Sequence, residues 1–159
     1  MSDELTHTKD GAAQMVDVGR KATSRRRAVA TGEIHLDPYT IELVNTDALE
    51  KGDVLATARI GAIQAVKHTW ETIPMCHQIP ITNAETTIDL HEDAIQLTVA
   101  VETIGQTGCE MEAIQGVTTG LSVIWDMVKS AEKGDDGSYP GTSIESVRVV
   151  DKTVEPIGS

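Results

Sequence analysis

Hydrophobic residues recur at helical spacing over one long segment, residues 110–132. Its apolar positions are Ile114, Val117, Leu121, Ile124 and Val128, at spacings of 3, 4, 3 and 4. This spacing places the apolar side chains on one face of a helix. The segment therefore predicts a long amphipathic helix that packs against a core.

Shorter segments have the pattern of strands. Residues 27–36 (RAVATGEIHL) approximately alternate between two faces, and residues 86–90, 95–101 and 144–150 are short runs rich in apolar and β-branched residues. His91-Glu92-Asp93 lies between the second and third of these segments and predicts a hairpin turn. We therefore expect four strands.

Two further helices are predicted between the first two strands. Asp37 and Pro38 suit the N-terminus of a helix over residues 39–49. Asp53 can cap a second helix over residues 54–70, which is rich in alanine and glycine and should pack tightly on a sheet or on a second subunit. Pro74 and Pro80 bracket a non-helical loop.

This order of elements predicts an α+β fold. An antiparallel sheet of about four strands with helices on one face is expected, and the ferredoxin-like sandwich is the natural candidate. Residues 1–14 are polar and are expected to form a flexible N-terminal tail. Residues 15–159 then make one domain, since a chain of 159 residues suffices for one sizeable core.

The charge balance restricts the partners. The chain has 13 basic and 25 acidic residues, a net charge of -12, which argues against binding to nucleic acid or to an anionic membrane. An acidic surface also suits a halophilic source. The two cysteines form no disulfide framework or metal-binding pair, no secretion signal or membrane span is recognised, and we expect a cytoplasmic protein.

Basic residues are scarce, so their positions are informative. Five of the 13 lie between Arg20 and Arg27, where they can bind phosphate or simply form a solvated strand edge. Lys51 precedes a helix N-terminus, where it can serve an anion site or an exposed turn. Asp126 and Lys129 lie three residues apart on the long helix, a spacing that fits a surface ion pair or an acid–base couple.

The loop residues Cys76 and His77 are candidates of another kind. His77 can act as a general acid or hydrogen-bond donor, or it can bond to its own loop backbone. Glu110 and Glu112 open the long helix, where the helix dipole favours carboxylates. The five histidines are scattered, so no metal-ligand set is predicted.

The length of the helix bears on assembly. Glu112 and Asp126 are 14 residues apart, which in a helix corresponds to roughly 21 Å. One small reacting centre cannot touch both residues. If both ends of the helix line active sites, either the ligand is long or sites are shared between subunits of a homo-oligomer.

Three long stretches resemble the cyclic pyranopterin monophosphate synthase family. They are MVDVGRKATSRRRAVATGEI, KGDVLATARIGAIQAVKHTWETIPMCHQIPIT and TGCEMEAIQGVTTGLSVIWDMVKSAEK, and they span most of the chain from Met15 to Lys133. The resemblance implies a ferredoxin-like catalytic domain that acts in molybdenum cofactor biosynthesis. It also implies a substrate derived from a nucleotide triphosphate, no cofactor, and a homohexamer, a trimer of dimers, with sites at a subunit interface.

The resemblance also implies roles for individual residues. Asp126 matches the family's active-site aspartate, and Lys51 and Lys129 match its catalytic lysines. The expected substrate-binding residues are Met75, Cys76, His77, Met111 and Glu112, with Lys21, Arg26 and Lys67 near the phosphates. These residues imply conversion of cyclised dihydro-GTP to cyclic pyranopterin monophosphate with release of pyrophosphate.

Two features differ from bacterial members of the family. The acidic loop of residues 134–141 has no match, and the C-terminus lacks the glycine-rich, lysine-containing tail of many bacterial members. Lys152 can stand in for a basic residue of that tail. Two alternatives remain open: a non-catalytic guanine-nucleotide-binding regulatory module and a scaffold subunit. Lys51, Lys129 and Asp126 favour an enzyme, because a binding module needs no proton-transfer couple.

Overall fold

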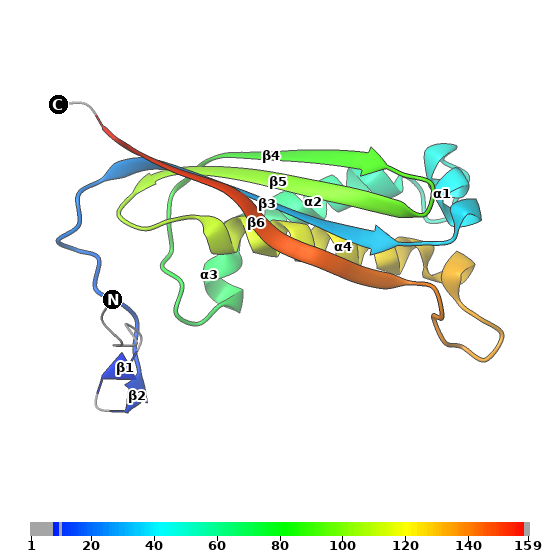
Figure 1. Cartoon of the computed structure of the whole chain (residues 1–159), viewed down its shortest axis with the longest axis horizontal. Helices are drawn as coiled ribbons and strands as arrows, with labels where there is room; N and C mark the ends of the chain where they lie inside the picture. The colour runs from blue at the N-terminus through cyan, green and yellow to red at the C-terminus, as the bar shows by residue number, and fades with distance from the viewer. Residues whose placement is uncertain (1–7, 10, 158–159) are drawn as a thin grey trace.

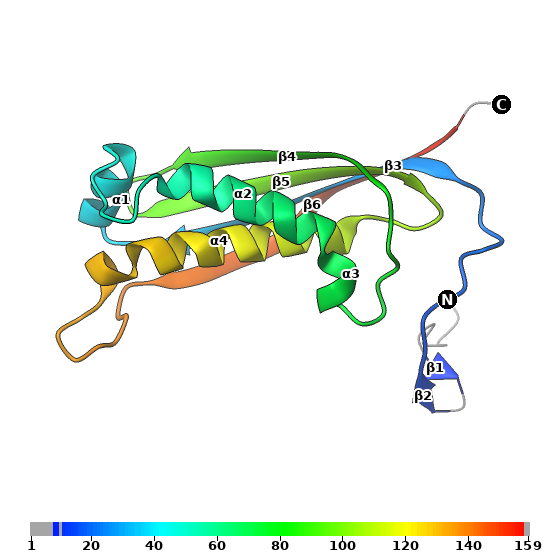
Figure 2. The same ribbon diagram turned by 180° about the vertical axis from the view of Figure 1, so that it is seen from behind.

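The computed structural model describes residues 8–9 and 11–157 and is built on one four-stranded antiparallel sheet. The strands are β3 (Ser24–His35), β4 (Ile81–Leu90), β5 (Ala94–Gly105) and β6 (Ser143–Pro156), in the order β4-β5-β3-β6. Two long helices, α2 (Val54–Lys67) and α4 (Glu110–Glu132), lie side by side on one face of this sheet (Figures 1 and 2).

The connectivity confirms the ferredoxin-like prediction. The chain runs β3-α2-β4-β5-α4-β6, so that each helix connects strands which are not neighbours in the sheet. β3 pairs with β5 without interruption from Ser24 opposite Gly105 to His35 opposite Ala94. The turn between β4 and β5 is closed by the His91 amide, which donates to the Ala94 carbonyl at 2.8 Å.

All four strands are longer than the sequence pattern predicted. β3 begins at Ser24, β4 at Ile81, and β6 extends to Pro156. The added segments are largely polar and exposed, and backbone hydrogen bonds hold them in the sheet at its margins. Side-chain alternation reveals only the portion of a strand that is half-buried, and it therefore underestimates these strands.

The predicted helix starts are confirmed, but two predicted ends are wrong. Helix α1 (Pro38–Asn45) is capped by the Asp37 carboxylate, which accepts from the Tyr39 amide at 2.8 Å. It stops at Asn45 rather than residue 49, and Asp47 then has a φ of 54° in the left-handed region. This turn reverses the chain sooner than the apolar pattern indicates.

The Asp53 side chain caps α2 by accepting from the Ala56 amide at 2.9 Å. α2 ends at Lys67 rather than residue 70, and a separate turn, α3 (Thr69–Thr72), follows. The break lies at His68, whose amide is shared between the Ala65 and Gln64 carbonyls. Such shared bonds are common at helix ends.

Small residues allow α2 and α4 to approach each other closely. Ala58 and Ala62 of α2 are fully buried. They face Gly120 of α4, where an added Cβ would lie 3.2 Å from the Ala62 Cβ and would overlap the Leu97 side chain of β5. The tight packing predicted for α2 is therefore made within the chain, against α4 and the sheet.

The N-terminal segment before β3 lies to one side of the sandwich (Figure 1). The predicted flexible tail, residues 1–14, falls partly outside the described residues, which exclude 1–7 and 10. Within it, β1 (Thr8–Lys9) and β2 (Ala12–Ala13) form a short antiparallel pair. None of the helices in the described ranges has the length and apolar character needed to span a membrane.

We predict that Gly120→Ala lowers the free energy of unfolding by about 1–2 kcal/mol. Overpacking costs about 1–3 kcal/mol, and the higher helix propensity of alanine offsets up to about 1 kcal/mol. Urea unfolding at one protein concentration measures the effect. Gly141→Ala is the control, because an added Cβ there meets no atom within 4 Å. Unchanged or increased stability of Gly120→Ala would contradict this packing.

Candidate active site

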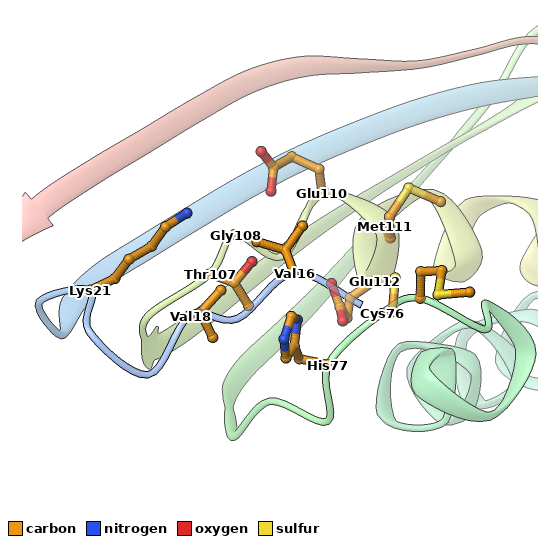
Figure 3. Close-up of a pocket in the computed structure, with 11 residues that line it drawn as sticks. Val16, Val18, Lys21, Cys76, His77, Thr107, Gly108, Glu110, Met111 and Glu112 are labelled. Atoms are coloured by element: carbon orange, nitrogen blue, oxygen red, sulfur yellow. The ribbon is translucent and has the colours of Figure 1, made fainter. Parts of the chain in front are cut away.

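A cavity of about 470 Å³ lies at the N-terminus of α4 (Figure 3). The N-terminal segment, the loop before β4 and the start of α4 all contribute to its wall. The lining residues are Val16, Val18, Lys21, Met75, Cys76, His77, Thr107, Gly108, Glu110, Met111 and Glu112. Six of the predicted substrate-binding residues, Lys21, Met75, Cys76, His77, Met111 and Glu112, are therefore brought together.

Two carboxyl groups of the cavity are in different electrostatic states. Glu112 is only 4% exposed, and burial, together with the charge of Glu110, raises the pKa of Glu112 to about 7. Partial burial acts on Glu110 in the same direction, but the hydrogen bonds from Lys152 and from its own backbone amide, with the charges of Lys152 and Arg26, together outweigh burial and lower the pKa of Glu110. Carboxyl groups whose pKa values diverge in one cavity can serve as a proton carrier and a fixed charge.

From the sequence, the helix dipole alone could explain the presence of Glu112 at the start of α4. The structure shows that this explanation is incomplete. Glu112 does lie in the first turn of α4, but its side chain is buried in the cavity wall. Glu110 was not among the predicted site residues, although it lies in the TGCEMEA stretch and lines the same cavity. Its position two residues before Glu112 was the available signal.

The cysteines of this region are poor nucleophiles. Burial first, and then the charge of Glu112, raises the pKa of the Cys76 thiol. The same causes raise the pKa of Cys109 to about 11, and its thiol donates to the Val101 carbonyl at 3.3 Å. Cys76 is consequently a contact group of the cavity, and Cys109 a packing residue behind it.

A second cluster joins Lys51 to the other end of α4. The Lys129 ammonium donates to one oxygen of Asp126 at 2.7 Å. Lys51 donates to the other oxygen at 3.3 Å and to the Asp126 carbonyl at 2.7 Å. The predicted Asp126–Lys129 pair is thus confirmed, and Lys51 is added to it.

This cluster is open to solvent in the single chain. The side chains of Asp126, Lys129 and Lys51 are 61%, 49% and 43% exposed. The hydrogen bond from Lys129, followed by that from Lys51, lowers the pKa of Asp126, and the same contact raises the pKa of Lys129. Lys129 is therefore a proton donor or a fixed cation in this state, and a proton acceptor only if its surroundings change.

The acidic loop of residues 134–141 adds an aromatic wall beside the second cluster. Tyr139 makes an edge-to-face contact with Trp125 at a centroid distance of 5.6 Å. Trp125, Asp126 and Lys129 line a hollow of about 260 Å³ together with Ser122 and Ile144. The loop therefore lies beside this hollow, which it contacts through the Tyr139–Trp125 pair.

The basic residues of the N-terminal region divide into three groups. Lys21 lines the cavity. Arg26 donates to the carbonyls of Gly105 and Gln106, both at 3.3 Å, next to the cavity wall. Arg27 pairs with Glu102 and Asp151. Arg27 therefore forms ion pairs on the strand surface, whereas Lys21 and Arg26 place positive charge at or beside the cavity.

Lys67 lies apart from these groups. It lines a separate hollow between α2 and β4 with Ile63, Ile79, Ile81, Thr82, Asn83 and Ala84. Within the described chain, the predicted site residues thus form the cavity cluster, with Arg26 beside it, the Asp126 cluster and the isolated Lys67. Across residues 11–157, no group of three His, Cys, Asp or Glu side chains is arranged to hold a metal ion.

Comparison with known proteins identifies the family. Residues 15–154 match the model of the MoaC family. A relative from Natronomonas pharaonis is 67% identical over 96% of this chain and 97% of its own length, and one from Halobacterium salinarum is 68% identical over 92% and 91%. Both are named "Probable cyclic pyranopterin monophosphate synthase", and both come from halophilic archaea, as the acidic composition led us to expect.

A third relative, from Methanothermobacter thermautotrophicus, is 52% identical over 94% of each chain. Its name is "Probable cyclic pyranopterin monophosphate synthase accessory protein". The family match covers both the cavity at the start of α4 and the cluster around Asp126. With its ferredoxin-like sandwich and both of these clusters, the chain belongs to the MoaC family.

Proposed function

We propose that this chain is a cyclic pyranopterin monophosphate synthase, a lyase that releases pyrophosphate from cyclised dihydro-GTP in molybdenum cofactor biosynthesis. The observation that carries the proposal is the contact of two lysines with one carboxylate, Lys51 and Lys129 on Asp126. A regulatory module that only binds nucleotide has no use for such a cluster. The names of the relatives support the same activity.

The residues divide between phosphate binding and proton transfer. Lys21 in the cavity and Arg26 beside it provide cationic groups suited to a triphosphate. Ring opening and pyranopterin formation require proton transfers, for which Lys51, Lys129 and Asp126 are the proposed catalytic groups. Because Asp126 keeps Lys129 protonated, we assign Lys129 the role of acid at the start of the reaction.

The last step closes the cyclic phosphate. A sugar hydroxyl attacks the α-phosphorus, the new O–P bond forms, the bond to pyrophosphate breaks, and the hydroxyl proton is taken up by a base. Positioning and charge stabilisation dominate such phosphoryl chemistry. A cavity with cations on its wall provides both.

The two clusters imply a site composed of two subunits. Glu112 and Asp126 occupy one continuous helix, and 14 residues correspond to roughly 21 Å along it. A closed oligomer, which we propose to be a trimer of dimers in the cytoplasm, can place the Asp126 cluster of one chain over the cavity of another. Such an arrangement also covers side chains that are about half exposed in a single chain.

We predict that Asp126→Asn lowers pyrophosphate release at least about 100-fold and leaves the oligomer folded. The neutral amide no longer balances the charge of two ammonium groups, so Lys129 loses its ion pair and Lys51 keeps only its bond to the residue-126 carbonyl. Steady-state turnover and gel filtration measure the two outcomes. Asp89→Asn on the exposed side of β4 is the matched control and should retain activity. Near-normal turnover of Asp126→Asn would refute its assignment.

The proposed reaction itself is tested by incubating the purified chain with cyclised dihydro-GTP. We expect pyrophosphate and cyclic pyranopterin monophosphate to form in equal amounts, because one leaving group is released per ring closed. Coupled phosphate detection and mass spectrometry measure the two products. Saturable binding without any turnover would instead identify a nucleotide-binding regulatory module.

A further inference from the structure

The last strand reaches the wall of the cavity through one ion pair. Lys152 of β6 lies opposite Ala28 of β3, and its ammonium contacts the carboxylate of Glu110, the first residue of α4. The preceding residue, Asp151, instead pairs with Arg27 at 3.3 Å. Successive strand residues point to opposite faces, so Lys152 is directed toward the cavity side of the sheet.

Glu110 is held in a confined position. Its carboxylate lies so close to Gly108 that a Cβ added there would overlap one of the carboxylate oxygens. Both Gly108 and Glu110 line the cavity, whereas Lys152 is not one of the lining residues. Figure 3 shows Glu110 on the strand side of the cavity and Glu112 on the side of the loop that carries His77. Lys152 therefore reaches the cavity by way of Glu110.

Several charged and titratable groups surround this pair of glutamates. They are Lys21 of the N-terminal segment, Arg26 of β3, Cys76 and His77 of the loop before β4, Cys109 before α4, and Lys152 of β6. Lys152 is the cation bonded directly to Glu110, while the charge of Arg26 acts on Glu110 more weakly. Lys152 is consequently well placed to control how much negative charge Glu110 presents to the cavity.

We propose that Lys152 is a positioning residue of the active site, which acts through Glu110 to fix the protonation of the buried Glu112. The inference rests on the proposed function, because it concerns the same cavity. With Lys152 present, Glu110 is ionised but largely neutralised, and Glu112 carries the exchangeable proton. Without Lys152, the uncompensated charge of Glu110 disfavours ionisation of Glu112 more strongly.

The test uses the full-length protein and five variants: Lys152→Ala, Lys152→Arg, Glu110→Gln, the double variant Lys152→Ala/Glu110→Gln, and Arg148→Ala. The pH profile of pyrophosphate release is recorded for each, and ¹³C NMR titration of the Glu112 carboxyl carbon provides a readout independent of turnover. Arg148→Ala is the matched control, because it removes an exposed cation from the same strand.

In the wild-type protein we expect Glu112 to titrate near a pKa of about 7. Lys152→Ala should raise this value by roughly half a unit to one unit, since a neutralising charge is lost. Glu110→Gln should lower it, because the negative charge beside Glu112 disappears. Lys152→Arg should restore the wild-type profile, and Arg148→Ala should not change it.

The double variant decides whether Lys152 acts through Glu110. We expect little further effect of Lys152→Ala once Glu110→Gln has removed the carboxylate charge. An equal shift in both backgrounds would show that Lys152 acts on Glu112 without Glu110, and would overturn the proposal. Unchanged titration of Glu112 in Lys152→Ala would also overturn it.

Failure of the proposed function gives a different result. In that case the wild-type protein releases no pyrophosphate, yet the NMR titrations of Glu112 still separate the variants. If Lys152→Ala does not fold, Lys152→Arg and Glu110→Gln still test the coupling. A downward shift of the Glu112 titration in Glu110→Gln is required, and its absence would contradict the proposal.

Discussion

The close packing of α4 against α2 and the sheet is the constraint on which the rest of the structure depends. Gly120 lies where β5 and Ala62 leave no space for a side chain. This packing holds α4 as one continuous helix from Glu110 to Glu132. Because a packed helix cannot shorten, the groups at its two ends are kept apart by a fixed distance. The proposed site, shared between two chains, follows from that separation.

The two ends provide different environments for acids and bases. Glu112 is buried and has a pKa of about 7, so it is ready to exchange a proton near neutral pH. Asp126 is exposed, ionised and bonded to two ammonium groups. A single chain therefore contains a proton carrier in a cavity wall and a charged cluster on an open surface. In the oligomer that we propose, bringing the two together would exclude water from the cluster that is open in a single chain.

Much of the fold could be predicted from the sequence because local rules determined it. The bounds of α4 agree with its apolar spacing, and Asp37 and Asp53 cap the helices that follow them. Strand ends were underestimated where backbone pairing involves polar, exposed residues. The end of α2 was misplaced because no composition signal marks His68, where the helix ends and the amide is shared between two carbonyls.

The sequence named candidate site residues, but it could not predict most of their contacts. Resemblance to the family selected Lys51, although 75 residues separate it from Asp126. The burial of Glu112 in the cavity wall and the pairing of Glu110 with Lys152 of β6 both depend on tertiary contacts. Spacing along the chain carries no information about such contacts. The aromatic wall that Tyr139 adds is likewise visible only in three dimensions.

The central claim is that one active site takes its cavity from one chain and its Asp126 cluster from another. Glu112→Gln and Asp126→Asn subunits, each first shown to be inactive alone, are mixed by denaturation and joint refolding, which tests the claim directly. Random assembly of equal amounts makes about a quarter of shared sites intact. We therefore expect mixed oligomers to regain about a quarter of wild-type pyrophosphate release. Complete inactivity of oligomers verified to contain both subunits would contradict the claim.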